Sequence, residues 1–193
     1  MADSDPISPL LQALKDLAAW LEDQQVRGAV IGGVAASLLG RPRATRDVDA
    51  VILLDSTKLE AFLAAGRQFG FSPRLSDAIP FAQRNRVLLA THEPSKTQVD
   101  LSLGILPFEE ETVARATIIS ISDVSFPVVT PEDLIIMKAI ARRPRDMADI
   151  ESVLDAHPNI DTDRIRYWVG QFAQVLESPE ILSDLDAMLS RHQ

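Results

Sequence analysis

The apolar positions near the start of the chain recur at the spacing of one helix face. Ser8 and Pro9 precede them and supply a capping hydroxyl followed by proline at the first helical position. This pattern predicts an amphipathic helix from residue 9 to about residue 25. Its apolar positions are Leu10, Leu14, Leu17 and Leu21.

Short apolar runs bounded by glycine or charged residues then predict two strands with a helix between them. Residues 28–33 are expected to form a buried strand that runs into a glycine turn, and residues 47–54 a second strand. Between them, residues 34–39 predict a helix closed by Gly40, and residues 41–46 form a basic loop.

A further helix and two hairpins are expected before residue 130. Residues 57–69 have helical periodicity, and Gly70 is suited to end the helix. Pairs of apolar runs separated by turn residues predict the hairpins. The first hairpin joins residues 86–91 and 97–103, and the second joins residues 118–121 and 125–129.

The pattern changes at Thr130, after which the apolar positions recur at helical spacing. Thr130-Pro131-Glu132-Asp133 combines an N-cap, proline at the first position and an acid three residues after the cap, so a helix begins here. Arg143-Pro144 interrupts this helix, and further helices follow. Their expected inward positions are Met147, Ile150, Leu154, Ile165, Val169, Phe172, Leu176, Ile181, Leu185 and Leu189.

Together, these elements predict an α/β fold of the α+β type, in which helices flank a mixed sheet and a helical segment follows it. Two domains are expected. Residues 1–129 would form a sheet domain with an N-terminal helix, and residues 130–193 a C-terminal helical subdomain.

Composition limits the chemistry of the chain. Its 193 residues include no cysteine and three scattered histidines, which removes disulfides, thiolate nucleophiles and a histidine metal centre. The formal net charge is −9, but residues 27–150 hold equal numbers of acids and bases, so the excess negative charge lies in the terminal segments. An acidic start and the lack of an apolar run of about 18 residues predict a cytoplasmic protein without a membrane segment.

Asp47 and Asp49 are the clearest candidates for chemistry. Alternate side chains of a strand share a face, so both carboxylates point the same way, while Val48 and Ala50 face the core. Two such charges about 5 Å apart would repel by about 3 kcal/mol at an effective dielectric constant of 20, which favours a bound cation or a raised pKa. Oxygen ligands without histidine or cysteine select Mg²⁺ or Mn²⁺ over zinc.

Two further features complete the candidate site. Gly32 and Gly33 lie between a strand and a helix, where a bare backbone can approach a polyphosphate and amides at the helix start can donate to it. Asp100 lies in a predicted strand and shares a face with Gln98 and Ser102, which makes it the best candidate for a third carboxylate.

The chain resembles the DNA polymerase beta-like nucleotidyltransferase superfamily in Gly32-Gly33, in Asp47-Val48-Asp49 after a gap of 13 residues, and in Asp100. The segments from Arg43 to Asp49 and from Lys138 to Ile150 are similar to its abortive-infection (AbiEii-like) toxin branch. The resemblance implies a minimal nucleotidyltransferase fold and an NTP donor. It also implies two Mg²⁺ ions, with Mn²⁺ as an alternative, and transfer of a nucleoside monophosphate to an acceptor hydroxyl.

The resemblance also implies a role for each residue. The carboxylates would bind the metal ions, and Asp100 would help activate the acceptor hydroxyl. The glycine pair would hold the β and γ phosphates. Arg43 and Lys138 would neutralise the charge that develops on the leaving pyrophosphate. The expected catalytic and metal-binding residues are Asp47, Asp49 and Asp100, and the expected nucleotide-binding residues are Gly32, Gly33, Arg43, Thr45 and Lys138.

Ordinary structural explanations exist for several residues. A surface ion pair of Arg43, a solvated Lys138 and a helix-capping Asp146 would each occur without a ligand. Asp123 is a weaker alternative to Asp100 as the third carboxylate. The aromatic residues on predicted helices are expected to pack in the protein rather than stack on bases. They are Trp20, Tyr167 and Trp168.

The leading hypothesis is Mg²⁺-dependent nucleotidyl transfer from an NTP to an RNA end or a protein, by the toxin of a bacterial toxin–antitoxin system with a cognate antitoxin. One alternative is a catalytically silent, nucleotide-binding regulatory module, although three candidate carboxylates count against it. The other is an antibiotic-modifying nucleotidyltransferase that acts on an aminoglycoside or lincosamide. If RNA is the acceptor, the negative terminal segments favour an end or a small structured element over a long nucleic acid.

Overall fold

The structure of the protein is a computed structural model that describes residues 8–192. This part of the chain forms two compact units. The first consists of the residues up to Val34 together with Thr45–Val128, and the second consists of Ala35–Ala44 together with the residues from Val129 onward. The sequence-based division into residues 1–129 and 130–193 stays a prediction.

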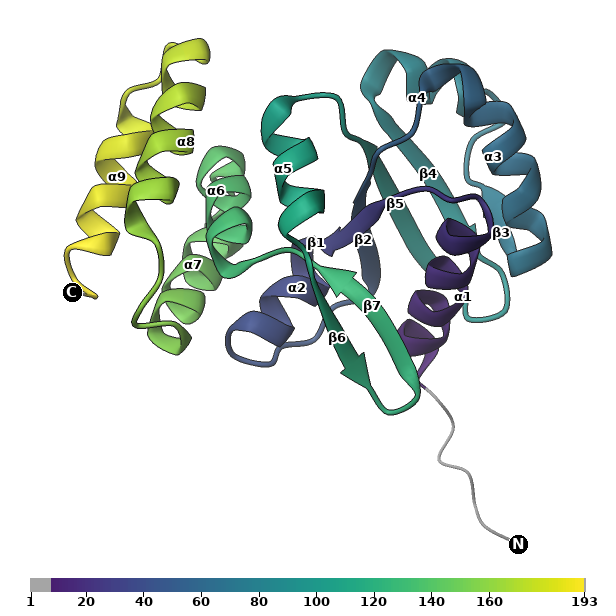
Figure 1. Ribbon diagram of the computed structural model, residues 1–193, viewed down its shortest axis with the longest axis horizontal. Helices are drawn as coiled ribbons and strands as arrows, with labels where there is room; N and C mark the ends of the chain where they lie inside the picture. Colours follow the sequence, from purple (N-terminus) through teal and green to yellow (C-terminus); the bar gives the residue numbers. More distant parts are fainter. Residues whose placement is uncertain (1–7, 193) are drawn as a thin grey trace, which may run out of the picture. The chain divides into compact units, whose positions relative to one another are not determined.

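Within the described residues, the first unit contains a seven-stranded mixed sheet in the order β3-β4-β5-β2-β1-β7-β6 (Figure 1). Strands β2 and β5 pair in parallel, as do β1 and β7, whereas the other neighbours are antiparallel. Both predicted hairpins are present, as β4–β5 and β6–β7. The strands are β1 (Gly28–Ile31), β2 (Asp47–Ile52), β3 (Phe71–Pro73), β4 (Val87–His92), β5 (Thr97–Leu103), β6 (Thr117–Ile121) and β7 (Val124–Val128).

Helices flank this sheet, which confirms the expected α/β fold class. Figure 1 shows α3 and α4 beside β3 and β4, at one end of the sheet. The helix expected over residues 57–69 is a short α-helix between two 3-10 turns, and it ends as expected at Gly70, whose φ of 84° is left-handed. The helices up to residue 128 are α1 (Pro9–Asp23), α2 (Gly32–Leu39), α3 (Leu59–Gly66), α4 (Ala78–Asn85) and α5 (Pro107–Arg115).

The first helix covers the face of the sheet opposite to the candidate carboxylates. Leu17 of α1 and Ala50 of β2 line the same small cavity, and Ala50 alternates with Asp49 along the strand. Near the end of α1, Trp20 is fully buried and stacks on Phe62 of α3, with 4.2 Å between the ring centroids. The prediction that Trp20 packs in the protein is therefore confirmed.

The second unit is helical. Thr130 Oγ1 accepts a hydrogen bond of 3.2 Å from the backbone N–H of Asp133, so it caps the first of these helices as expected. No helix within residues 8–192 is both long and apolar enough to cross a membrane. The helices are α6 (Pro131–Ala141), α7 (Pro144–Ala156), α8 (Thr162–Val175) and α9 (Glu180–Leu189).

Most of the expected inward positions of these helices are buried. The exceptions are Met147 and Phe172, which are partly exposed, and Leu176, which is 50% exposed; Tyr167, which the sequence predicts to pack in the protein, is 60% exposed. Leu176 follows the last helical residue of α8, where the chain no longer follows the helix face, and Tyr167 lies edge-on to Trp168, with 5.3 Å between the ring centroids. The packing prediction is therefore wrong for both. The buried positions are Ile150, Leu154, Ile165, Val169, Ile181, Leu185 and Leu189.

The sequence pattern does not predict three elements, namely β3, α4 and α5. Strand β3 has only three residues, and α4 contains a proline and begins without a side-chain cap. Helix α5 follows Leu106, whose side chain cannot cap a helix. Glu109 Oε2 replaces that cap, because it accepts hydrogen bonds from the backbone N–H groups of Ile105 at 2.7 Å and Leu106 at 2.9 Å.

Candidate active site

Three acids of the first unit share one face of the sheet. Strands β2 and β5 pair in parallel register, with Asp47 opposite Gln98 and Asp49 opposite Asp100. Paired residues of neighbouring strands point to the same side, so the fold brings these acids together as the sequence predicts. We call Asp47, Asp49 and Asp100 the carboxylate face. Asp47 is exposed, and the other two acids are partly exposed.

Gly32 lies against the carboxylate face, at the first residue of α2. Its φ is +63°, and an added Cβ would lie 2.1 Å from Oδ2 of Asp49. A side chain at this position would therefore be strained and would displace the carboxylate. Glycine is required here because the backbone turns and because Asp49 lies beside the start of the helix, where the helix dipole stabilises a negative charge.

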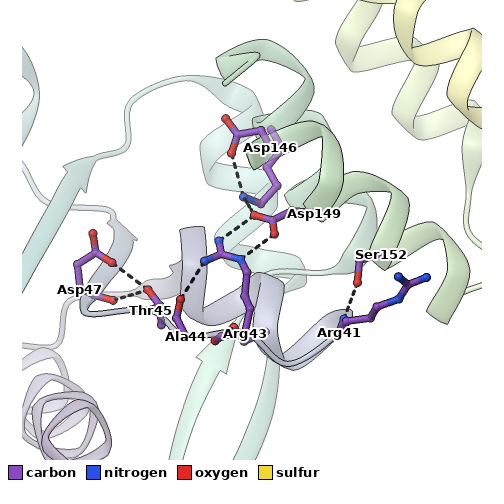
Figure 2. Close-up of polar contacts among 10 residues, drawn as sticks. Arg41, Arg43, Ala44, Thr45, Asp47, Asp146, Asp149 and Ser152 are labelled. Carbon is purple, nitrogen blue, oxygen red and sulfur yellow. Dashed lines mark hydrogen bonds and ion pairs between the residues drawn. The ribbon is translucent and has the colours of Figure 1, made fainter. Parts of the chain in front are cut away.

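Thr45 orients the first acid of the face. Its Oγ1 donates a hydrogen bond of 2.9 Å to Oδ1 of Asp47, as Figure 2 shows. The sequence interpretation placed Thr45 among the nucleotide-binding residues, and that role stays a prediction. The contact adds a different role, since the hydroxyl holds the side chain of Asp47 in one orientation.

Arg74 is the residue of this face that the sequence reasoning missed. It follows β3, and its guanidinium donates from Nη1 to Oε1 of Gln98 at 2.7 Å and from Nη2 to Oδ1 of Asp100. Its side chain is 22% exposed. The pairing joins residues 26 positions apart across three strands, and no local motif around Arg74 indicates it.

The environment of Asp100 is unfavourable to its charge. Burial raises the pKa of its carboxyl above the ordinary value, and the negative charge of Asp47 raises it further, while the guanidinium of Arg74 acts in the opposite direction. Arg74 is thus the cation that opposes this rise of the pKa.

The donor set of the face is compatible with a hard divalent cation. Asp47 and Asp49 offer carboxylate oxygens on one side of the strand, which is the donor type that Mg²⁺ and Mn²⁺ prefer. The space beside Gly32 is occupied by the carboxylate of Asp49 rather than by a Cβ. Within residues 8–192, however, no group of three or more acidic, histidine or cysteine side chains is arranged to hold a metal ion.

The second unit contains an ionic cluster of Arg43, Lys138, Asp146 and Asp149, which we call the Asp149 cluster. Lys138 Nζ donates to Asp146 Oδ1 at 3.0 Å and to Asp149 Oδ2 at 2.6 Å. Arg43 donates from Nε at 2.8 Å and from Nη2 at 2.9 Å to the two oxygens of Asp149 (Figure 2). Two cations and two carboxylates are therefore balanced within one cluster.

The Asp149 cluster differs from what the sequence pattern predicts. The side chains of Lys138, Asp146 and Asp149 are only 7–9% exposed. The interpretation of Lys138 as a solvated surface residue is therefore wrong. Asp146 does accept a hydrogen bond of 3.1 Å from the backbone N–H of Arg143, which is the expected capping contact. Burial acts to raise the pKa of Asp149, but the hydrogen bonds and charges of Arg43 and Lys138 outweigh it and lower that pKa.

Arg43 is anchored by a loop that is itself attached to α7. The backbone N–H of Arg41 donates to Ser152 Oγ at 2.5 Å, as Figure 2 shows, and its guanidinium pairs with Asp155 at 2.5 Å. The Oγ of Ser37 donates to the backbone oxygen of Arg43 at 2.9 Å. Arg41 and Arg43 of the predicted basic loop therefore contact acids of their own unit.

The weaker candidate for a third carboxylate lies elsewhere in the first unit. Asp123 is in the turn between β6 and β7, and its carboxylate pairs with Lys15 of α1 at 2.9 Å. Both side chains are well exposed, at 61% and 48% respectively. Asp100, in register with Asp49, is therefore the third acid of the face.

Comparisons with known proteins agree with this architecture, which is that of a nucleotidyltransferase. The chain belongs to the family described as "Nucleotidyl transferase of unknown function (DUF2204)", whose model matches residues 10–185. It is therefore an enzyme of the nucleotidyltransferase class. No curated protein matched the sequence.

Solved structures of similar fold come from the same class. A nucleotidyltransferase-like antigenic protein from Paracoccidioides brasiliensis is 18% identical, with a TM-score of 0.56 over 90% of this chain and 92% of that chain. The antibiotic-resistance factor ANT(2'')-Ia is 14% identical, with a TM-score of 0.60 over 89% and 95% of the two chains. Its complex with adenylyl-2''-tobramycin gives a TM-score of 0.59 at 14% identity, over 88% and 99%.

Proposed function

We propose that this protein transfers a nucleoside monophosphate from an NTP to an acceptor hydroxyl, with a divalent metal ion bound at the carboxylate face. The observation that carries the proposal is the parallel register of β2 and β5, which places Asp100 beside Asp49 and leaves three acids on one face. Family membership supports the reaction class. The bound metal ion, the acceptor and the role of each residue are what we propose beyond the reaction class.

The residues of the face suit this reaction. Asp47 and Asp49 would hold Mg²⁺ or Mn²⁺, and the ion, when bound, would supply positive charge for the phosphates and polarise the oxygen atoms of the reaction. Thr45 holds Asp47 in one orientation through its hydrogen bond. Gly32 gives Asp49 the space that it occupies, and we assign the first N–H groups of α2, at Gly32 and Gly33, to the β and γ phosphates.

The roles predicted for Arg43 and Lys138 have a weaker basis. Their side chains contact Asp149 in their own unit, so each would have to leave or share that carboxylate to bind pyrophosphate. We assign them first to the integrity of the Asp149 cluster, and their phosphate role stays a prediction.

The acceptor that we propose first is an RNA end or a protein, with the enzyme acting as the toxin of a toxin–antitoxin system. The support is the similarity of the segments from Arg43 to Asp49 and from Lys138 to Ile150 to the abortive-infection branch. A cognate antitoxin would then be the natural protein partner.

A small-molecule acceptor is the second candidate. The similarity in fold to ANT(2'')-Ia extends over 89% of this chain and 95% of that one, so it includes nearly all of both chains. That structure is described as an antibiotic-resistance factor, and a second structure of it contains adenylyl-2''-tobramycin. An aminoglycoside hydroxyl is therefore the acceptor to test beside RNA and protein.

The test is transfer of label from each of the four α-phosphate-labelled NTPs to RNA, to protein in a cell extract and to purified aminoglycosides, with and without Mg²⁺. We expect metal-dependent transfer to one acceptor class, and a loss of at least about 100-fold in Asp49→Asn, because a ligand of the metal is removed. Asp77→Asn is the matched control, since Asp77 is 57% exposed and pairs with Arg84 on the surface.

Two results would contradict the proposal. One is the absence of metal-dependent transfer to any of the three acceptor classes. The other is transfer that Asp49→Asn and Asp77→Asn reduce to the same extent, because the chemistry would then not involve the carboxylate face.

A further inference from the structure

The cation at Asp100 belongs to the protein itself. Arg74 enters the carboxylate face from the end of β3, where its backbone N–H donates to the carbonyl oxygen of Leu89 at 3.0 Å. Its side chain then contacts Gln98 and Asp100 on β5, which are the residues opposite Asp47 and Asp49. Backbone and side chain are thus both fixed, which distinguishes Arg74 from a surface arginine.

Resting on the proposed function, we propose that Arg74 is the resident cation of Asp100, so that the carboxylate face binds one divalent ion, through Asp47 and Asp49. The family resemblance implies two ions instead. In this chain, the positive charge of the guanidinium takes the place that a second ion would have at the third carboxylate.

The guanidinium of Arg74 already pairs with Asp100, so the charge of this third carboxylate is balanced within the protein. A guanidinium stays protonated throughout the range in which proteins fold, so Arg74 cannot give up its charge to admit a metal ion. A second ion would have to displace it from Asp100 physically.

The position of the Arg74 side chain leaves one of its nitrogen atoms without a hydrogen bond. Its Nε is buried and has no hydrogen-bond partner, although the two terminal nitrogens are bonded to Asp100 and Gln98. A buried donor without a partner is unfavourable, so the position of the side chain depends on the two contacts that it does make. Removing Arg74 would leave Asp100 as a partly buried carboxylate next to Asp47, open to another cation.

The experiment counts Mn²⁺ ions bound per chain, at pH 7, from the loss of the electron paramagnetic resonance signal of free Mn²⁺. We expect one ion on the wild-type chain, two on Arg74→Gln, and one again on the double variant Arg74→Gln with Asp100→Asn. Arg74→Lys keeps a cation and is expected to bind one. Arg84→Gln is the matched control on an exposed arginine of α4, and it is also expected to bind one.

A second measurement does not depend on the folding of any Arg74 variant. In the otherwise wild-type chain, Asp100→Asn is expected to change the Mn²⁺ affinity by less than about 3-fold, whereas Asp49→Asn weakens it by at least about 10-fold. Two ions on the wild type, or a loss of 10-fold or more in Asp100→Asn, would overturn the inference and leave the proposed function standing. A wild-type chain that binds no Mn²⁺ would overturn both.

Discussion

The carboxylate face of the first unit and the Asp149 cluster of the second are built from the same residue types with opposite results. On the face, one of the three acids, Asp100, pairs with an arginine, and the pKa of Asp100 is raised. In the cluster, two acids share Arg43 and Lys138, and the pKa of Asp149 is lowered. The acids of the face are at least partly exposed, whereas the cluster holds equal numbers of acids and cations.

The difference teaches which acids are available for chemistry. In a balanced and largely buried cluster, each charged side chain already has a partner of opposite charge. Its groups therefore hold the structure together, and losing one of them leaves an unpaired charge. An accessible group of neighbouring acids costs free energy unless cations lie close to it. Motif resemblance alone does not separate the two, because both clusters lie in segments that resemble the same family.

The largest expected effect of a single substitution on stability is that of Asp149→Asn. The variant removes the carboxylate that Arg43 and Lys138 share, so we expect the free energy of unfolding to fall by about 3 kcal/mol. Urea denaturation measures it. The control is Asp155→Asn, because Asp155 pairs with Arg41 at the surface and should contribute less than about 1 kcal/mol. Equal effects of the two substitutions would remove the distinction between cluster and surface pairs.

Gly32→Ala should have the next largest effect. Its positive φ alone costs a residue with a Cβ about 1–2 kcal/mol, and the new Cβ would displace the carboxylate of Asp49. We therefore expect both a lower urea midpoint and lower transfer activity. Gly170→Ala is the control, since the added Cβ in α8 would meet only Leu182, at 3.8 Å, and should stabilise the helix slightly. A stable and fully active Gly32→Ala protein would contradict the geometry described for Asp49.

The two regions should also respond oppositely to acid. The pKa of Asp149 is lower in the folded chain than the value of about 3.9 in an unfolded one, so its carboxylate stabilises the fold above that pH. This stability is lost as the pH falls through the folded-state pKa. Asp149→Asn should therefore lose less stability than the wild type between pH 5 and pH 2, as measured by urea midpoints. A parallel decline in both proteins would show that Asp149 does not differ in pKa between the two states.

The pKa of Asp100 is raised in the folded chain, so ionisation of its carboxyl lowers stability at neutral pH, and protonation restores it as the pH falls through that raised value. Without metal ions, Asp100→Asn should therefore lose more stability on acidification than the wild type. The same series of urea midpoints provides the comparison, and a difference in the opposite direction would contradict it.

The smallest expected effect on stability is that of Asp47→Asn. Removing one exposed charge from a group of neighbouring acids relieves repulsion, so in the absence of metal ions the free energy of unfolding should be unchanged or rise by at most about 1 kcal/mol. Transfer activity should nevertheless fall. A clear loss of stability would show that Asp47 has a structural role like that of Asp149.

The sequence predicts the elements of this fold where its signals are local. Ser8 accepts from the backbone N–H of Leu11 and begins α1, and Thr130 begins α6 in the same way. The alternation around Asp47 and Asp49 correctly predicts a strand with both acids on one face. Such signals depend on neighbouring residues only, so they can be read without knowing the fold.

What the sequence does not predict depends on distant partners. Arg74 contacts Asp100 because β3, β4 and β5 are neighbours in the sheet, and Lys138 is buried because Asp146 and Asp149 on the next helix provide its counter-charges. A lysine beside apolar positions predicts exposure unless its acidic partners are known. The residues of the candidate site were identified by spacing, but their counter-ions required the tertiary structure.

The central claim is that the carboxylate face holds the divalent ion and the triphosphate of the donor. It is tested most directly by a crystal structure of the full chain with Mn²⁺ and a non-hydrolysable analogue of the NTP that is active in the transfer assay. We predict one anomalous peak in contact with the carboxylates of Asp47 and Asp49, with the triphosphate at the start of α2 near Gly32. A bound analogue and Mn²⁺ with no contact to either aspartate would contradict the account.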